Sequence, residues 1–195
     1  MTPASLPIEN DDGAVIGRLI PISQSTLSDK AAIQALTDWR NRNADCFFTQ
    51  FTATPDRTER WIRGALLGRE DQKLFLIYHG DQLVGHFGFK DLTGETALLD
   101  NAMLGVRCDY PKIMVKAGRA LVRWLFDEVG VTTVFGAVFA DNVPALMMNK
   151  EIGFRTASKV FLKRESTVDG ASWVEAAEGG DKKCYKIEMT RADLK

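Results

Sequence analysis

The chain has 195 residues, a length that suits one domain large enough to bury a hydrophobic core without disulfides or metal. Its 25 basic and 26 acidic residues leave a net charge of −1, and the basic residues are scattered among acidic ones, so the composition does not favour nucleic-acid binding. The N-terminus lacks a basic start followed by an apolar core, and no apolar run approaches the roughly 20 residues of a membrane span, so we expect neither a secretion signal nor a membrane segment.

The three cysteines lie far apart in the sequence. Cys46, Cys108 and Cys184 form no CxxC pair, and they have no metal-ligand spacing with His79 or His86. This pattern is typical of reduced thiols, so we expect a cytoplasmic protein without a metal site.

The first third of the chain predicts a tail, a strand and two helices. Residues 1–12 are polar and end in Asp-Asp-Gly, which predicts a flexible tail ahead of a single domain over residues 13–195. An apolar stretch predicts a strand over 16–22. Apolar residues at helical spacing, with capping residues ahead of them, predict helices over 29–41 and 55–67.

The middle of the chain predicts three antiparallel strands and a helix. Apolar runs over 74–78 and 83–89 flank Gly80-Asp81, a composition typical of a tight hairpin. A third strand is expected over 97–106, where two polar residues interrupt the apolar run. An apolar stripe then predicts a helix that begins near Ala117 and packs on the sheet.

The last third predicts a strand over 131–139, a helix over 142–153 that ends on a glycine, and strands over 154–163 and 184–189. The polar segment 165–183 is longer than most loops, and it is interpreted either as a flexible hairpin tip or as a functional segment. Together the elements predict an α/β (α+β) fold with a mixed, mostly antiparallel sheet of about seven strands flanked by about four helices.

A short pattern identifies a family that this chain resembles. The strand over 131–139 is followed by Asn142-x-x-Ala145, then by seven residues, and then by Gly153-Phe154. This pattern and the order of elements over about residues 14–190 resemble the GCN5-related N-acetyltransferase (GNAT) superfamily, which has the acyl-CoA N-acyltransferase fold. The resemblance implies an enzyme that transfers an acetyl group from acetyl-CoA, its co-substrate, to an amine.

The resemblance also implies where the donor lies. In this family the strands equivalent to 97–106 and 131–139 splay apart, and acyl-CoA occupies the gap. A backbone N–H near Leu104, Gly105 or Val106 would hold the thioester carbonyl as a pre-oriented donor. Asn142 caps a helix and would also bond the pantetheine arm.

The diphosphate is expected at the N-terminus of the helix that begins near Ala117. The family usually carries Arg-Gly-x-Gly-x-Gly there, and this chain keeps only Gly118 of that pattern. Lys112, Lys116 and Arg119 supply cations that could meet the phosphates, although surface cations at a helix start are common. Asn149 stands where the family often has a Tyr that protonates the leaving thiolate, and an asparagine cannot act as that acid.

Two residues are candidates for the general base that must deprotonate the acceptor ammonium. Asp100 interrupts an apolar strand at a position where many family members carry a carboxylate. His86 on the neighbouring strand titrates in a useful range. The alternatives are a carboxylate that caps a bulge for Asp100 and a packing histidine for His86.

The acceptor is expected to bind near the first helix. Trp39-Arg40-Asn41 resembles a signature of acetyltransferases that act on amino sugars carried by nucleoside diphosphates, and Phe48 and Gln50 follow it. Arg40 could contact a phosphate or carboxylate, and aromatic rings could stack on a base or sugar. Trp39 could equally be a core residue, and Arg40 could pair with a nearby aspartate.

Three functions remain open from the sequence. The first is acetylation of a small-molecule amine, most directly an amino sugar nucleotide, and the second is acetylation of a protein N-terminus, as in the ribosomal-protein-type relatives. The third is a catalytically degenerate GNAT-fold domain that binds a ligand or oligomerises. The resemblance allows a homodimer, and the acceptor amine is not determined by the sequence.

Overall fold

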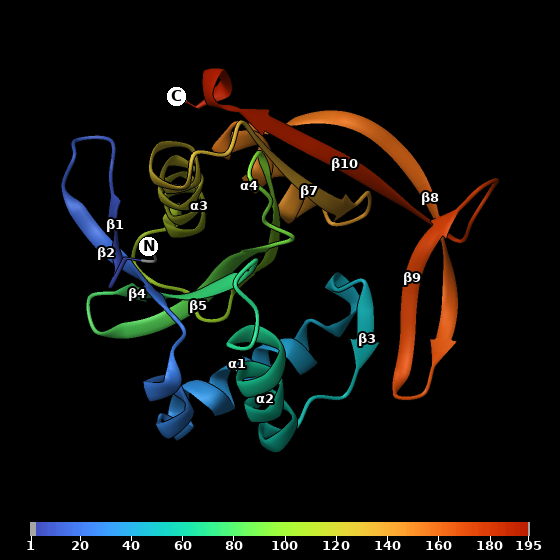
Figure 1. Ribbon diagram of the computed structural model, residues 1–195, viewed down its shortest axis with the longest axis horizontal. Coiled ribbons are helices and arrows are strands. Elements are labelled where there is room, and N and C mark those ends of the chain that lie inside the picture. The colour runs from blue at the N-terminus through green and yellow to red at the C-terminus, as the bar shows by residue number, and fades with distance from the viewer. Residues whose placement is uncertain (1–2, 195) are drawn as a thin grey trace.

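The computed structural model describes residues 3–194, and within them ten strands form one twisted sheet (Figure 1). The strand order is β1-β2-β4-β5-β6-β7-β10-β8-β9-β3, and only β6 and β7 are parallel to each other. The strands are β1 (Leu6–Glu9), β2 (Val15–Pro21), β3 (Thr49–Phe51), β4 (Lys73–His79), β5 (Gln82–Lys90), β6 (Thr96–Leu104), β7 (Thr133–Phe139), β8 (Arg155–Thr167), β9 (Gly170–Ala176) and β10 (Lys182–Thr190).

Three of the four α-helices in the described residues begin after a capping side chain. Asp29 accepts a hydrogen bond from the Ala32 amide, Thr54 from the Arg57 amide and Asn142 from the Ala145 amide. The four α-helices are α1 (Lys30–Arg42), α2 (Pro55–Trp61), α3 (Ile113–Trp124) and α4 (Val143–Ile152). Short 3-10 helices occupy Gln24–Ser28, Ala44–Cys46 and Arg191–Asp193, and α2 and α3 continue as π-turns over Ile62–Leu66 and Leu125–Val129.

Two hydrophobic layers cover the two faces of the sheet (Figure 1). α3 and α4 pack on one face, where Phe87 and Leu121 are fully buried. α1 and α2 pack on the other face, where Trp39 and Ile62 are buried. The sheet is therefore a central layer between two pairs of helices, and this confirms the predicted fold class. Within residues 3–194, every helix is too short or too polar to cross a membrane.

The structure corrects the expectation of a flexible tail at the N-terminus. Leu6–Glu9 forms β1, which pairs with β2, and the side chains of Leu6 and Ile8 are buried. A run of four residues is too short for its alternating pattern to predict a strand from the sequence. Part of the expected tail is therefore an edge strand of the sheet, whereas residues 1 and 2 lie outside the described residues.

The polar segment 165–183 is an ordered hairpin rather than a loop. β8 and β9 pair over seven positions, and β9 also pairs with β3 in the segment between α1 and α2. β1, β3 and β9 account for the excess over the seven strands expected. The β8–β9 hairpin, hereafter the arm, thereby reaches across to β3 in the segment between α1 and α2 (Figure 1).

Candidate active site

The parallel strands β6 and β7 separate after a short paired stretch. They pair only at Thr96↔Thr133, Ala97↔Val134 and Leu98↔Phe135. Beyond Leu98 the two facing edges have no partner strand, and a cleft of about 380 Å³ opens between them. Backbone groups along these edges are left free to bind a ligand.

A β-bulge in β6 lies just past the point of separation. Gly88 pairs with Asp100 and His86 with Met103, so β6 contains one residue more than β5 over this stretch. Asn101 within the bulge has a φ of 52°, in the left-handed region that Asn tolerates better than most residues. The bulge bends β6, and this contributes to its divergence from β7.

Asp100 lines the cleft and is held by two neighbours. Lys90 lies 3.3 Å from Asp100 Oδ2 through its Nζ atom, and Asn101 Nδ2 donates to the same oxygen over 2.8 Å. The side chain of Asp100 is 34% exposed, so solvent reaches the carboxylate. The second carboxylate oxygen, Oδ1, takes part in neither of these contacts. The predicted base therefore stands in the cleft.

His86 occupies a different environment from Asp100. Its ring is 5% exposed, stacks at 6.1 Å on Trp39 of α1, and places Nδ1 2.6 Å from the carbonyl oxygen of Asn101. Burial lowers the pKa of His86 to about 4, with a further lowering from the charge of Arg40. The structure thus places the second base candidate beside the bulge, among packed groups of the α1 layer, as in the alternative reading of a packing histidine.

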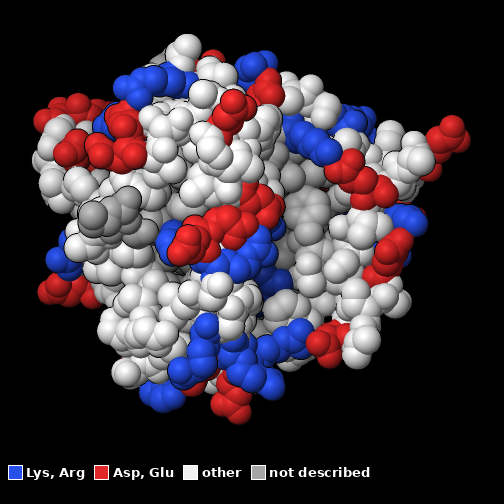
Figure 2. Space-filling view, viewed as in Figure 1, with Lys and Arg blue, Asp and Glu red and all other residues white. Residues whose placement is uncertain are grey.

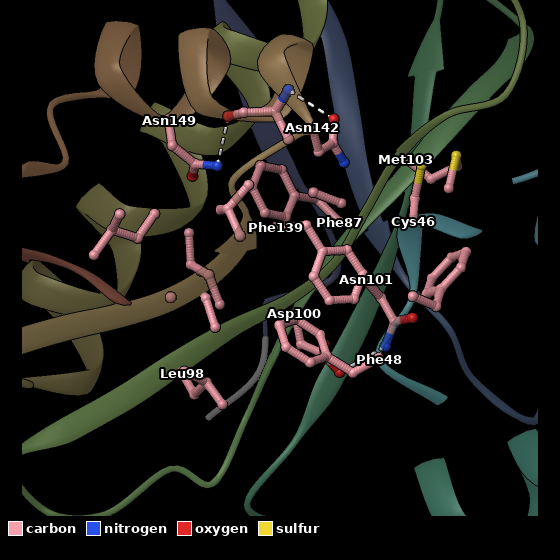
Figure 3. Close-up of a pocket in the computed structure, with 18 of the residues that line it drawn as sticks. Cys46, Phe48, Phe87, Leu98, Asp100, Asn101, Met103, Phe139, Asn142 and Asn149 are labelled. Carbon is pink, nitrogen blue, oxygen red and sulfur yellow. Dashed lines mark hydrogen bonds between the residues drawn. The ribbon is translucent and has the colours of Figure 1, made fainter. Parts of the chain in front are cut away.

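Residues of α4 and its N-terminal cap form one side of the cleft. Asn142 and Asn149 lie across the cleft from Asp100 and Phe48 (Figure 3). Asn142 accepts from the Ala145 amide over 3.2 Å, and Asn149 donates from Nδ2 to the Ala145 carbonyl over 2.8 Å. Asn142 thus combines its predicted cap with a place in the cleft. Asn149, at the position where the family often has a tyrosine, is 8% exposed.

The structure corrects the expected start of the diphosphate helix. α3 begins at Ile113, one turn before Ala117, because buried apolar residues extend its stripe towards the N-terminus. Ala117 and Gly118 therefore lie inside the helix and in the core. A Cβ built at Gly118 would meet Ile152 Cδ1 at 2.4 Å and Phe87 Cε1 at 2.9 Å, so glycine permits close packing there.

The three cations predicted for the phosphates contact protein groups instead. Lys112 pairs with Glu151 at 3.1 Å, and Arg119 donates to the Glu151 carbonyl at 2.6 Å. Lys116, 7% exposed, pairs with Asp11 in the hairpin between β1 and β2. These contacts join α3 to α4 and to the N-terminal hairpin. Arg107, in the loop before α3, is exposed and was not considered from the sequence.

Two of the amides predicted to hold the thioester carbonyl are bonded within the protein. The amides of Gly105 and Val106 both donate to the Val84 carbonyl, over 2.8 and 3.0 Å. Leu104, at the end of β6, is 40% exposed. The part of β6 that lines the cleft is 98–103.

On the acceptor side, Arg40 lines the cleft and packs between aromatic rings. Its guanidinium carbon lies 3.7 Å from the centre of the Phe47 ring and 4.6 Å from that of Phe51, and Nη2 donates to the Thr49 carbonyl at 2.5 Å. Burial lowers the pKa of Arg40 to about 10, so the guanidinium remains charged at neutral pH. Arg40 does not pair with a neighbouring aspartate.

Of the other residues predicted to bind the acceptor, one lines the cleft and the rest contact other parts of the protein. Phe48 lines the cleft and stacks on Phe139 at 4.4 Å. Trp39 is buried in the core, and Asn41 exchanges two hydrogen bonds with the backbone of Ala53, which fixes the segment between α1 and α2. Gln50 accepts from Arg164 of the arm at 3.4 Å. Of the Trp-Arg-Asn signature, therefore, only Arg40 faces the cleft.

Several residues that line the cleft were missed from the sequence. They come from β5, β6, β7 and the segment after α1: Cys46, Phe47, Phe87, Lys90, Asn101, Met103 and Phe139. The bulge signal, Asp100-Asn101 within an apolar strand, could have identified Asn101. Lys90 depends on the shifted register between β5 and β6, which sequence periodicity does not reveal.

Charges on this face of the molecule are mixed. Figure 2 shows acidic and basic side chains next to one another around a hollow near the centre of the view, and no single sign dominates it. Such a surface gives little long-range attraction for a polyanion. Recognition of a charged ligand would therefore depend on individual groups in the cleft.

Comparison with known proteins identifies the family. A model of the acetyltransferase (GNAT) domain matches residues 18–155, which is more than half of the chain. The chain therefore belongs to the GNAT acetyltransferase family, and its class is that of an acyl-CoA-dependent N-acetyltransferase acting on amines. This confirms the family, the fold and the class of enzyme predicted from the sequence. No curated protein matches the chain in sequence.

Solved structures of low sequence identity share the fold. An acetyltransferase from Salmonella typhimurium that modifies the N-terminal serine of ribosomal protein L7/L12 is 13% identical, with a TM-score of 0.71 over 95% of this chain and 98% of that one. The microcin C7 self-immunity acetyltransferase MccE, in complex with acetyl-CoA and AMP, is 15% identical, with a TM-score of 0.71 over 97% of each chain. The Campylobacter jejuni N-acetyltransferase PseH is 13% identical, with a TM-score of 0.57 over 90% of this chain and 99% of that one.

Proposed function

We propose that this protein transfers an acetyl group from acetyl-CoA to the primary amine of a small acceptor that carries an anionic group, most directly an amino sugar nucleotide. The observation that carries the proposal is the cleft between β6 and β7. It places a carboxylate, Asp100, between unpaired strand edges on one side and an aromatic-lined arginine, Arg40, on the other. Both substrates would be bound at once, so no enzyme nucleophile is needed.

The donor half of the cleft fits an acyl-CoA. The pantetheine arm carries two amide groups, and the free edges of β6 and β7 past Leu98 offer backbone partners of the same kind. Asn142 adds a side-chain amide at the start of α4. The diphosphate would lie against the loop before α3, where Arg107 and the first amides of the helix favour an anion.

The chemistry then needs a proton acceptor and an oxyanion donor. Acetyl-CoA supplies an activated acetyl group. Asp100 accepts the proton that the acceptor ammonium must lose before its nitrogen can attack. An amide on the free edge of β6, within 99–103, stabilises the charge that develops on the acetyl oxygen. No phenol stands at Asn149, and the thiolate of CoA is a tolerable leaving group near neutral pH.

The acceptor half favours a ligand with a negative group and a flat face. Arg40 has its charge partly desolvated by Phe47 and Phe51, and within this wall it is contacted by rings and a carbonyl rather than by a carboxylate. The charge of Asp100 acts on Arg40 from a distance and opposes the lowering of its pKa, and a phosphate would bind the guanidinium directly. Phe48, backed by the buried Phe139, offers ring surface for a base or sugar.

The structural relatives are compatible with more than one acceptor. MccE is in complex with AMP, PseH is an N-acetyltransferase, and the Salmonella protein modifies a ribosomal-protein N-terminus. At 13–15% identity the structural similarity supports a shared fold and does not identify the acceptor. The choice of acceptor therefore rests on Arg40 and its aromatic neighbours.

The proposal is tested by measuring CoA release with three matched acceptors: an amino sugar linked to a nucleoside diphosphate, the same amino sugar alone, and a peptide with a free N-terminal serine. We expect the highest kcat/KM with the nucleotide-linked sugar. A higher value with the peptide would favour a protein N-terminal acetyltransferase. Hydrolysis of acetyl-CoA without acceptor is subtracted as the control.

A degenerate domain without catalysis is the remaining alternative. It predicts no amine-dependent CoA release with any of the three acceptors, although the protein is folded. Equal release with and without the nucleotide would retain the transferase and remove the anionic acceptor. These outcomes separate the enzyme class from the acceptor class.

A further inference from the structure

We propose that His86 is a positioning residue that fixes the bulge of β6 by a hydrogen bond to the Asn101 carbonyl, and that this contact sets the direction of the Asp100 carboxylate. The inference rests on the proposed function, in which Asp100 is the base. It assigns His86 a role that is neither proton transfer nor simple packing.

The bulge creates a backbone group that needs a partner. An extra residue leaves the β5–β6 ladder locally unpaired, and a carbonyl away from water costs free energy unless it accepts a hydrogen bond. The Asn101 carbonyl lies in this stretch, and His86 Nδ1 is 2.6 Å from it. A side chain of β5 thus replaces the strand pairing that the bulge removes.

The contact fixes the tautomer of the ring. A carbonyl oxygen can only accept, so Nδ1 must carry the proton. Burial and the charge of Arg40 lower the pKa of His86 to about 4, so the imidazole is neutral at pH 7 and Nε2 carries no proton. Trp39 stacks on the ring at 6.1 Å and restricts its rotation. His86 is therefore a fixed donor.

The bulge in turn orients the base. Asn101 has a φ of 52°, and its side chain donates to Asp100 Oδ2 over 2.8 Å. Asn101 is thus bonded at both ends, through its carbonyl to His86 and through its amide to Asp100. If the carbonyl contact is lost, the left-handed conformation of Asn101 loses its support and the Asp100 carboxylate loses a fixed direction.

The first test requires no activity. Long-range proton–nitrogen NMR of the wild-type protein reports which imidazole nitrogen carries hydrogen. We expect the Nδ1–H tautomer for His86, without titration between pH 6 and 8. An Nε2–H tautomer would overturn the inference, whether or not the protein is an acetyltransferase, so its failure is distinct from failure of the proposed function.

The second test compares two substitutions of His86. In His86→Asn, the amide nitrogen lies as many bonds from Cβ as Nδ1 does, so it can donate to the same carbonyl, whereas His86→Leu keeps an apolar side chain without a donor. We expect kcat for His86→Asn within about threefold of the wild type, and kcat for His86→Leu at least tenfold lower, with KM for acetyl-CoA unchanged in both.

The structure offers a matched control in His79. Its Nδ1 also lies 2.6 Å from a backbone carbonyl, that of Ile16, but at the far end of β4. We expect His79→Leu to leave kcat unchanged. A His86→Leu variant as active as His86→Asn, or more active, would indicate packing and overturn the inference. Equal loss in both folded variants would indicate a role of the ring itself and would also overturn it.

Discussion

The two halves of the cleft differ in the groups that form them. The donor half depends on backbone: two parallel strands that stop pairing after Leu98, and a helix start capped by Asn142. The acceptor half depends on side chains from distant segments, with Arg40 and Phe48 near α1 and the arm behind them. We infer that the donor half tolerates sequence change more readily, while single residues decide the acceptor.

The largest effect should come from the residue where the two halves meet. Asp100→Asn removes the proton acceptor, so kcat should fall by about 10²–10⁴-fold. Activity should partly return at higher pH, because more of the acceptor amine is then already neutral. Steady-state kinetics across pH measures both effects.

The exposed hairpin residue Asp81 provides the control for charge removal. Asp81→Asn should leave kcat unchanged. An Asp100→Asn variant with the wild-type kcat at neutral pH would remove Asp100 from the base role and would leave the donor half of the account intact.

The next effect tests the acceptor half alone. Arg40→Met removes the charged donor and keeps an apolar chain against Phe47 and Phe51, so KM for an anionic acceptor should rise by about 10–100-fold, which corresponds to a charged hydrogen bond of about 1.5–3 kcal/mol. KM for acetyl-CoA should stay constant. The exposed Arg63 on the α2 side serves as control, through Arg63→Met. A parallel rise in both KM values would contradict the division into two halves.

A smaller effect is expected from the arm. A Cβ at Gly170 would lie 2.0 Å from the Gln50 carbonyl oxygen, so Gly170→Ala should disrupt the pairing of β9 with β3. Because β3 carries the Thr49 carbonyl that holds Arg40, KM for the acceptor should rise about threefold to tenfold, by partial loss of that contact. Gly94→Ala, where a Cβ would meet nothing within 4 Å, is the control.

The last effect concerns stability and pH rather than activity. The folded-state pKa of His86, about 4, lies below the ordinary value of 6.5, so the unfolded chain binds the proton more readily between these values. The contribution of neutral His86 to the free energy of unfolding is therefore fully present above about pH 6.5. It is lost as pH falls towards 4, by up to about 1.4 kcal/mol per pH unit. Denaturant unfolding at a series of pH values measures the free energy of unfolding against pH. This free energy should depend more steeply on pH in the wild type than in His86→Asn, whereas parallel curves would contradict the shifted pKa.

The sequence predicted the features that depend on backbone pattern better than those that depend on contacts between distant segments. Periodicity and caps predicted the order of elements. That order and the Asn142-x-x-Ala145 pattern carried the resemblance to the family, and the resemblance implied the separation of two strands. The stretch of β6 that lines the cleft, 98–103, precedes the expected contact near Leu104, and it contains a bulge that the apolar pattern does not reveal.

Tertiary contacts explain the remaining differences. Lys112, Lys116 and Arg119 look like free cations in sequence, but Glu151 and Asp11 lie 32 to 105 positions away along the chain and meet them only after folding. Asp100 was found because a carboxylate is unusual in an apolar strand. Lys90 was not found, since a lysine at a strand end is ordinary.

Binding of acetyl-CoA between the separated strands is tested most directly by ligand-induced thermal stabilisation. The measurement compares the wild type with two variants of α4. Ala145→Trp fills the cleft at the start of α4, whereas Met147→Trp places the same side chain on the exposed face of that helix, at a residue that is 53% exposed. At 100 times the dissociation constant, acetyl-CoA should stabilise wild type and Met147→Trp by about 2.7 kcal/mol and leave Ala145→Trp nearly unchanged. Equal stabilisation of all three proteins, or none in the wild type at millimolar acetyl-CoA, would contradict a donor site in this cleft.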